Sequence, residues 1–519
     1  MDVVLVGAAG SGTRAVARDL GRRHGWDLVD VDAVLAAHVG APDTTTGPWT
    51  VESGSPRVFI ADGALTRTRL RHELYSGRLV AWLDAPPTRL VGRLRAAPPL
   101  ATLPGPGPLT ALGAHEEAME WYFGAGVRLD ATLPTSRLAD EVERLLRQAQ
   151  PSGTLVARAD TGVGLLEIGD DIVARGIADA LLRLPGERAA ILTERRVWAD
   201  LGDRIASAMR AIDARFDVVI VPPGEHAKTL SSQFRTLREL ANLRLARRGA
   251  IVAVGDDRIC DAATYTAGVY LRGVPLVTVP TTTLGQVDLA IGGKGSVNLD
   301  LGRNLVGVFH QPTGIVLDVN LLHDEPSRER RAAFAEVLKY ALLGDAELFT
   351  LIEAAASDAP SPSPIGEADL PEIVERCALA KLRTVLADER DLAGPRVALN
   401  LGHTVSHALE AAMDYRLLHG EAVAYGLRTA LAIGVEVGIT PPALAERGVT
   451  VLDQLQLGCD RVEVDVEAVM TRVAADKKRL RGRTRWVLAT GSGVAIRSDI
   501  PDSLVGQILG RVLRGQTAD

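Results

Sequence analysis

The sequence has little of what marks secreted, membrane-spanning or nucleic-acid-binding proteins. Cysteine occurs only three times, at Cys260, Cys377 and Cys459, and an odd number of distant thiols argues for a reducing compartment without disulfides. No apolar run reaches the roughly 18–20 residues of a membrane span, and the amino terminus lacks the basic start of a signal peptide. The net charge of −7 includes no long basic run, which argues against nucleic acid as a partner. We therefore expect a cytoplasmic protein.

The length of 519 residues is too great for a single core and, at about 150 residues per domain, predicts about three domains. Apolar residues make up 47% and charged residues 24%, as in ordinary globular proteins. The segment RQAQPSGT at 147–154 is polar, with proline and glycine, and is typical of a linker. We expect domains over 1–150, 155–322 and 323–519.

The first residues have the layout of a phosphate-binding loop without its charged groups. VVLVG at 3–7 is typical of a buried strand, and the glycine-rich GAAGSGTR at 7–14 precedes a helical pattern. In the P-loop pattern G-x-x-x-x-G-K-[ST], the lysine reaches the β/γ-phosphates and the hydroxyl binds Mg²⁺. Here Thr13 replaces the lysine and Arg14 replaces the hydroxyl residue. The segment therefore predicts a mononucleotide-type α/β fold that is kept as a scaffold.

Strand and helix patterns alternate between 155 and 322, which predicts a parallel sheet flanked by helices. In such sheets, ligands bind beyond the carboxyl ends of the strands. Three predicted strand ends carry polar or glycine-rich segments, which include Glu225 and Lys228, then Gly255 and Asp261, then Thr281, Thr282, Asp288, Gly292, Gly293, Lys294 and Asn298. A solvated turn would explain any one of them. Their recurrence predicts a site for a phosphorylated, hydroxyl-rich ligand.

The last third is largely helical in pattern, and it contains three histidines within 17 positions. His403 and His407 stand four apart in LNLGHTVSHALE, so both would project from one helix face, and His419 opens a second apolar run. A surface or capping role is the simpler interpretation for one histidine. Three of them, at a corner between two helices, favour a site for a divalent cation such as Zn²⁺. The spacing does not identify the remaining ligand among the acidic residues.

From residue 155 onwards, a series of motifs resembles the 3-dehydroquinate synthase family of sugar phosphate cyclases. PPGEHAK, RGVPLVTVPTT, QVDLAIGGK, RNLVGVFHQP, AEVLKY and LNLGHTVSHALE followed by HGEAV occur in the family's order. The resemblance implies an enzyme with a Rossmann-like NAD-binding α/β domain and an all-helical metal-binding domain. It also implies NAD and Zn²⁺ or Co²⁺ as cofactors, a sugar phosphate as substrate, and a homodimer.

The resemblance implies roles for individual residues. The metal ligands would be Glu336, His403 and His419. The positions matched to substrate binding and catalysis are Asp288, Lys294, Asn304, Lys339, Lys381, Arg396, Asn400, His407 and Lys477, with Arg272 reaching a neighbouring subunit's site. The positions matched to cofactor binding are Glu225, Lys228, Gly255, Asp261, Thr281, Thr282 and Leu284. Such a cationic set suits a substrate with a phosphate and a carboxylate.

The departures from the family lie in the cofactor loop, where Gly255-Asp256-Asp257 replaces a triple glycine. Two carboxylates next to a dianionic diphosphate predict weaker binding of NAD⁺, which Arg258 would partly offset.

Residues 1–150 resemble shikimate kinase, with Asp30 and Asp32 matching its Asp-x-Asp. Ala97-Pro98-Pro99-Leu100 lacks the arginine of that family's lid.

The resemblance thus implies a 3-dehydroquinate synthase fused to an inactive kinase-like domain. Two alternatives stay open: a sibling cyclase that acts on another sugar phosphate, and a non-enzymatic scaffold.

Overall fold

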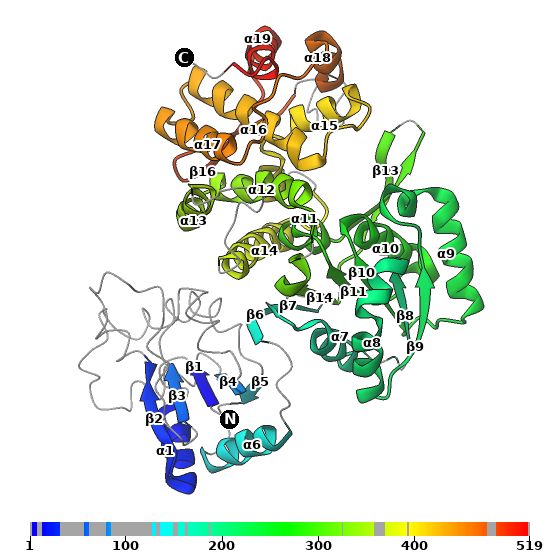
Figure 1. The fold of residues 1–519 in the computed structure, drawn as a ribbon, viewed down its shortest axis with the longest axis vertical. Helices are drawn as coiled ribbons and strands as arrows, with labels where there is room; N and C mark the ends of the chain where they lie inside the picture. The colour runs from blue at the N-terminus through cyan, green and yellow to red at the C-terminus, as the bar shows by residue number, and fades with distance from the viewer. Residues whose placement is uncertain are drawn as a thin grey trace. The chain divides into compact units, whose positions relative to one another are not determined.

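The computed structural model describes most of the chain, and Figure 1 shows its elements. The described residues are 3–7, 13–31, 57–61, 79–84, 127–130, 135–148, 154–160, 164–184, 186, 188–300, 302–323, 325–357, 369–391, 394–474 and 484–516. The chain forms two compact units, residues 1–180 with 316–320, and residues 181–315 with 321–519. Among the described helices, none is long and apolar enough to cross a membrane.

The first unit contains a parallel sheet with the strand order β2-β3-β1-β4-β5. The strands are β1 (Val3–Gly7), β2 (Asp27–Asp30), β3 (Arg57–Ala61), β4 (Leu79–Asp84) and β5 (Val127–Asp130). β1 is the middle strand of this sheet. Its apolar valine and leucine side chains are buried, as expected for a strand of a parallel sheet that is covered on both faces. Helices α1 (Thr13–His24) and α6 (Thr135–Gln148) pack against each other.

The first unit also holds β6 (Thr154–Asp160), β7 (Leu165–Asp170) and α7 (Val173–Leu182) as far as residue 180, and β6 and β7 pair antiparallel. In the P-loop-like segment, Arg14 lies in the first turn of α1 and forms an ion pair of 2.6 Å with Asp30 at the end of β2. Gly12 and Asp32 lie outside the described residues.

Four parallel strands of the second unit follow one another in the order β9-β8-β10-β11, and β11 pairs with the start of β14, whose residues from 316 onwards belong to the first unit. They are β8 (Arg188–Thr193), β9 (Arg215–Ile220), β10 (Ala250–Gly255), β11 (Leu276–Pro280) and β14 (Gly314–Asp318). Every residue of β10 and β11 is buried, as expected for apolar strands covered on both faces. The connecting helices are α8 (Arg195–Ala211), α9 (Leu230–Asn242), α10 (Asp257–Val269) and the short α11 (Thr283–Val287).

The order of these strands contains a topological switch point between β8 and β10. From β8 the chain moves outward to β9, and it then returns to place β10 on the other side of β8. Ligands of open parallel sheets bind in the crevice that such a reversal opens beyond the carboxyl ends of the strands. Thr193 ends β8 and Gly255 ends β10, so the residues that follow them are candidates for ligand binding.

Helices make up most of the remainder of the second unit. They are α12 (Ser327–Leu342), α13 (Ala346–Ser357), α14 (Leu370–Ala387), α15 (His403–Ala412), α16 (His419–Glu436), α17 (Pro442–Gln454), α18 (Val466–Ala474) and α19 (Asp502–Leu513). Two antiparallel pairs accompany them, β12 (Lys294–Leu299) with β13 (Gly302–Phe309), and β15 (Trp486–Thr490) with β16 (Gly493–Arg497). Helix α16 packs against α12, α15, α17 and α19 (Figure 1).

Two glycines of α16 set how closely this helix approaches its neighbours. A Cβ on Gly420 would lie 1.9 Å from the carbonyl oxygen of Ala332 in α12, and a Cβ on Gly426 would lie 1.9 Å from that of Gly402. No side chain fits at either contact, so glycine is required for the backbones to touch. These contacts bring His419 at the start of α16 close to α12 and to the start of α15.

The α/β fold with a parallel sheet and many helices confirms the predicted fold class at this level. Helix α14 ends at Ala387, because Asp388 adopts a non-helical conformation.

Candidate metal, substrate and cofactor sites

Glu336, His403 and His419 come together from three helices, although 67 and 83 residues separate the histidines from the glutamate in sequence. The Nε2 atoms of His403 and His419 each lie 3.1 Å from Oε1 of Glu336. One potential ligand atom from each residue lies within 4.8 Å of the others. Glu336 is fully buried in α12, and the histidines are the first residues of α15 and α16.

The positions of the two histidines follow from how their helices begin. Gly402 has φ +79°, a left-handed conformation that glycine adopts at little cost, and α15 starts at the next residue. At the start of α16, the Glu421 carboxylate accepts a hydrogen bond of 2.9 Å from the backbone N–H of Leu418. Arg328 of α12 donates to both oxygens of the same carboxylate, at 2.7 and 2.8 Å. The first turn of α16 is therefore tied to α12.

Each imidazole is oriented by an acceptor at its other nitrogen. Nδ1 of His403 lies 3.0 Å from the carbonyl oxygen of Leu401, and Nδ1 of His419 lies 3.3 Å from both carboxylate oxygens of Glu410. An Nδ1 proton that is donated to such an acceptor leaves the Nε2 lone pair for a metal ion. The sequence did not single out Glu410. Its position seven residues after His403, on the same face of α15, is the signal that would have found it.

The electrostatics of this cluster favour a bound cation. Burial acts to raise the pKa of Glu336, but the Lys339 ammonium and His403 hold that pKa well below its usual range. Burial acts to lower the pKa of His419, yet its hydrogen bonds with Glu336 and Glu410 raise it to about 10. A buried carboxylate and two imidazole nitrogens form the donor set of a catalytic zinc site that keeps one position open. The cluster therefore fits a divalent metal ion.

A second buried cluster surrounds Asp288, close to Glu336. Lys339 Nζ lies 2.6 Å from Glu336 Oε2 and 3.3 Å from Asp288 Oδ1, so this ammonium bridges the two clusters. Lys381 Nζ lies 2.8 Å from Asp288 Oδ2, and the Tyr340 hydroxyl donates to Oδ1. Burial acts to raise the pKa of Asp288, but the two lysines hold it below its usual range. Burial lowers the pKa of Lys381 to about 8, although Asp288 opposes this shift.

Arg396 lies beside this lysine cluster. Its guanidinium donates to the carbonyl oxygens of Gly292 and Glu389, at 2.7 and 2.6 Å. A Cβ on Gly292 would lie 2.9 Å from Nη2 of Arg396 and 3.0 Å from Cε of Lys381. Glycine at this position therefore lets two cationic side chains converge on one point, which suits an anionic group of a ligand.

The structure places the other residues predicted for substrate binding in different ways. His407 is exposed, and its ring centroid is 5.5 Å from that of His403. Lys294 is exposed and forms an ion pair of 2.7 Å with Asp391. The side chain of Asn400 donates to the carbonyl oxygen of Val397 at 3.1 Å. Arg272 is exposed, and Lys477 lies outside the described residues.

A third polar cluster lies between the strand-end segments and the β12–β13 hairpin. Lys228 pairs with Asp261 and donates to Asn304, and the Ser296 hydroxyl oxygen lies 2.8 Å from Asp261 Oδ2 and 2.9 Å from Asn304 Oδ1. Asn298 donates to Glu225 at 2.6 Å and accepts from the backbone N–H of Asn304 at 3.0 Å. The structure thus joins Asn304, predicted as a substrate residue, to the residues predicted for the cofactor. Ser296 was missed, because only the pairing of β12 with β13 brings it to this place.

The switch point carries several carboxylates. Glu194 follows β8, and Asp256 and Asp257 follow β10. Burial, and then the neighbouring Asp256, raise the pKa of Glu194. Thr282 caps α11 by accepting from Gly285 N at 3.2 Å, and its hydroxyl lies 3.4 Å from Asp257. Thr281 donates its backbone N–H to Gly255, and Leu284 is half-buried in α11.

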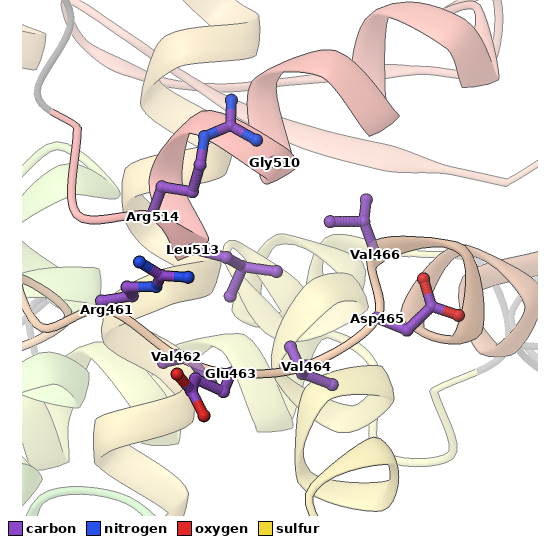
Figure 2. Close-up of a pocket in the computed structure, with 9 residues that line it drawn as sticks. All are labelled: Arg461, Val462, Glu463, Val464, Asp465, Val466, Gly510, Leu513 and Arg514. Carbon is purple, nitrogen blue, oxygen red and sulfur yellow. The ribbon is translucent and has the colours of Figure 1, made fainter.

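A surface groove of about 370 Å³ lies between residues 461–466 and α19. Figure 2 shows valine and leucine side chains along it, with the guanidiniums of Arg461 and Arg514 on one side. None of the residues that line it belongs to the three clusters above.

Family models and curated relatives of this chain all carry the description 3-dehydroquinate synthase. The family model for the amino-terminal part of 3-dehydroquinate synthase matches residues 218–332, and the model for its carboxyl-terminal part matches residues 333–479. The 3-dehydroquinate synthase of Rhizobium rhizogenes strain K84 is 36% identical over 347 residues, which cover 65% of this chain and 91% of that protein. The 3-dehydroquinate synthase of Symbiobacterium thermophilum is 38% identical over 332 residues, 63% of this chain and 92% of that protein.

Solved structures agree on the fold. The 2-epi-5-epi-valiolone synthase of Streptomyces hygroscopicus, with NAD⁺ and Zn²⁺ bound, matches with a TM-score of 0.58 and 25% identity, and covers 66% of this chain and 94% of that one. A 2-deoxy-scyllo-inosose synthase with carbaglucose-6-phosphate, NAD⁺ and Co²⁺ matches with a TM-score of 0.57 and 23% identity, over 67% of this chain and 96% of that one. With the two family models and the relatives above, these matches show that the chain belongs to the 3-dehydroquinate synthase family.

Proposed function

We propose that the chain is a 3-dehydroquinate synthase, which converts 3-deoxy-D-arabino-heptulosonate 7-phosphate to 3-dehydroquinate and phosphate in the shikimate pathway. The observation that carries this proposal is the bridge through Lys339, which joins the metal-binding set at Glu336 to the buried anion-binding set at Asp288. The family membership and the 36% identity to a curated 3-dehydroquinate synthase support the same activity.

The cofactors are NAD⁺ and a divalent metal, Zn²⁺ or Co²⁺. Glu336, His403 and His419 would hold the metal. The switch point between β8 and β10 is where a dinucleotide would bind to this sheet, and Glu194, which follows β8, would be the acidic residue that binds a ribose. A Glu194 carboxylate there favours NAD⁺ over NADP⁺, because it would repel a 2′-phosphate. NAD⁺ supplies the hydride acceptor, and the metal ion supplies a Lewis acid beside a substrate hydroxyl.

The chain's own residues bind and orient the substrate. Lys381 and Arg396 converge beside Gly292 and provide cationic partners for the substrate carboxylate. Lys339 holds a positive charge between Glu336 and Asp288, where it stabilises negative charge that develops on the substrate near the metal. Lys294, Asn400, His407 and Lys477 complete the proposed set.

We also propose roles for the rest of the chain. Residues 1–150 form a shikimate kinase-like domain without kinase activity, residues 155–322 the NAD-binding domain, and residues 323–519 the helical domain. The central β1 followed by a glycine-rich segment supports the kinase-like fold. Its Arg14 pairs with Asp30 at 2.6 Å and so places a fixed cation where the P-loop pattern has an Mg²⁺-binding hydroxyl. The active form is a homodimer, in which Arg272 reaches the partner's site.

The acidic residues in the cofactor loop favour one alternative, a protein that binds the sugar phosphate without turning it over. The other alternative is a sibling cyclase that acts on another sugar phosphate. Lys381 and Arg396, the proposed partners of the substrate carboxylate, distinguish the two activities, because a substrate without a carboxylate would not need them. The test is to incubate the protein, NAD⁺ and Zn²⁺ with the heptulosonate phosphate and, separately, with glucose 6-phosphate, which lacks a carboxylate. We expect a cyclised product and released phosphate only from the first, and an Arg396→Lys variant should raise KM for it. A product only from the second would contradict the proposal.

A further inference from the structure

The amino terminus of α10 already binds carboxylates of its own chain. Asp256 caps this helix, and its Oδ1 accepts a hydrogen bond of 2.9 Å from the backbone N–H of Ile259. Asp257, the first residue of α10, is buried next to this cap. In other dinucleotide-binding folds, such first-turn N–H groups bind the diphosphate. One of them is therefore already bound here by an acidic side chain, and two carboxylates lie at the helix terminus, which does not fit a diphosphate in the usual way.

Arg258 is the cation at this place. Its guanidinium lies 3.2 Å from Asp256, 3.6 Å from Asp257 and 3.5 Å from Glu225. These carboxylates hold it at the carboxyl edge of β10, beside the switch point, and a third of its side chain is exposed. A guanidinium has five N–H donors in a planar fork, so it can bind a phosphate oxygen while it keeps a carboxylate partner.

We propose that Arg258 binds the diphosphate of the dinucleotide in this chain, in the place of the helix N–H groups, and that the carboxylates around it hold it in position. This inference rests on the proposed use of NAD⁺. It assigns to Arg258 a direct contact, and this differs from the simpler role in which the guanidinium only neutralises Asp256 and Asp257. The two roles predict different results once both aspartates are removed.

The test is a double-mutant cycle on NAD⁺ affinity, measured by calorimetry without substrate. It compares the parent, Arg258→Gln, the glycine pair Asp256→Gly with Asp257→Gly, and the triple variant. We expect the glycine pair to bind NAD⁺ more tightly than the parent, because the backbone N–H of Ile259 is released and two negative charges are lost. We expect Arg258→Gln to weaken NAD⁺ binding at least about tenfold in both backgrounds, because a charge-assisted contact to phosphate is lost in each.

Controls separate this effect from misfolding and from general charge. Arg188→Gln removes an arginine that pairs with Asp217. Both residues lie in the amino-terminal halves of β8 and β9, away from the switch point at the carboxyl ends, so this change should leave NAD⁺ affinity unchanged. Adenosine, which lacks the diphosphate, should bind equally to the parent and to Arg258→Gln. Arg258→Lys keeps the charge without the fork and should lose less affinity than Arg258→Gln.

The inference is wrong if Arg258→Gln has no effect in the glycine background, since Arg258 would then act only on the two aspartates. It is also wrong if adenosine loses as much affinity as NAD⁺. If neither the parent nor the glycine pair binds NAD⁺, the proposed cofactor itself fails, and the inference fails with it.

Discussion

Replacing Asp288 by asparagine should destabilise the second unit, because it leaves the buried Lys339 and Lys381 without the carboxylate that they share. At 3.3 and 2.8 Å and an effective dielectric near 20, each attraction is of order 5–6 kcal/mol before the cost of desolvation. Removing one partner of a buried ion pair typically costs about 3–5 kcal/mol. We expect a loss of this size in the free energy of unfolding at pH 7, measured by denaturant titration.

The loss should shrink as the pH rises. Burial already lowers the pKa of Lys381 to about 8, and removal of Asp288 lowers it further. A lysine whose pKa is lowered in the folded state reduces the free energy of unfolding. This loss is largest at pH values below the lowered pKa, and it disappears as the pH approaches the ordinary lysine pKa of about 10.4. The difference between Asp288→Asn and the parent should therefore be smaller at pH 9.5 than at pH 7, while the part that comes from Lys339, whose pKa is raised, should remain.

Asp453→Asn is the matched control. It removes the carboxylate that pairs with the buried Arg428 on α16, and an arginine does not lose its proton at these pH values. Its loss of stability should be equal at pH 7 and pH 9.5. The reasoning is refuted if Asp288→Asn costs less than about 1 kcal/mol at pH 7, or if its loss is as independent of pH as that of the control.

Three further predictions follow from the clusters. His403→Ala and His419→Ala should each lose the bound metal in elemental analysis after dialysis, while the exposed His407→Ala keeps it; metal retained in both of the first two would contradict the assignment. Substrate KM should rise above a pH of about 8 as Lys381 loses its proton, and Lys381→Arg should move that rise to higher pH; equal profiles would show that Lys381 does not bind the substrate. The full chain should not phosphorylate shikimate with ATP and Mg²⁺, because a single missing arginine can reduce such rates by about 10³–10⁵-fold, and here the P-loop lysine is absent as well; detectable phosphorylation would disprove this.

Motifs that lie within one segment were readable from the sequence. The spacing of His403 and His407 predicted a helix, and His419 was placed at the start of the next one; α15 and α16 confirm both. The same spacing placed His403 and His407 on one helix face, and their ring centroids lie 5.5 Å apart. Glu336, from a distant helix, lies beside His403 and His419. The close contacts at Gly420 and Gly426 hold α16 against α12 and against the start of α15, and so bring the three residues together.

Contacts that depend on packing between elements could not be read. Glu410 reaches His419 only because α15 and α16 pack side by side, and Tyr340 reaches Asp288 only because α12 is buried on nearly all sides. Likewise, the sequence predicted two carboxylates in the cofactor loop, but not that Asp256 would cap α10. Local patterns thus identified the elements and the kinds of residue, while tertiary packing decided the partners.

The central claim is tested most directly by incubating the purified full chain with 3-deoxy-D-arabino-heptulosonate 7-phosphate, NAD⁺ and Zn²⁺ and measuring 3-dehydroquinate together with released phosphate. The proposal predicts equal amounts of both products over many turnovers, and loss of both after chelation of the metal or in His403→Ala. The account would be contradicted by a parent protein that is folded, holds one metal ion and binds NAD⁺, yet forms no 3-dehydroquinate.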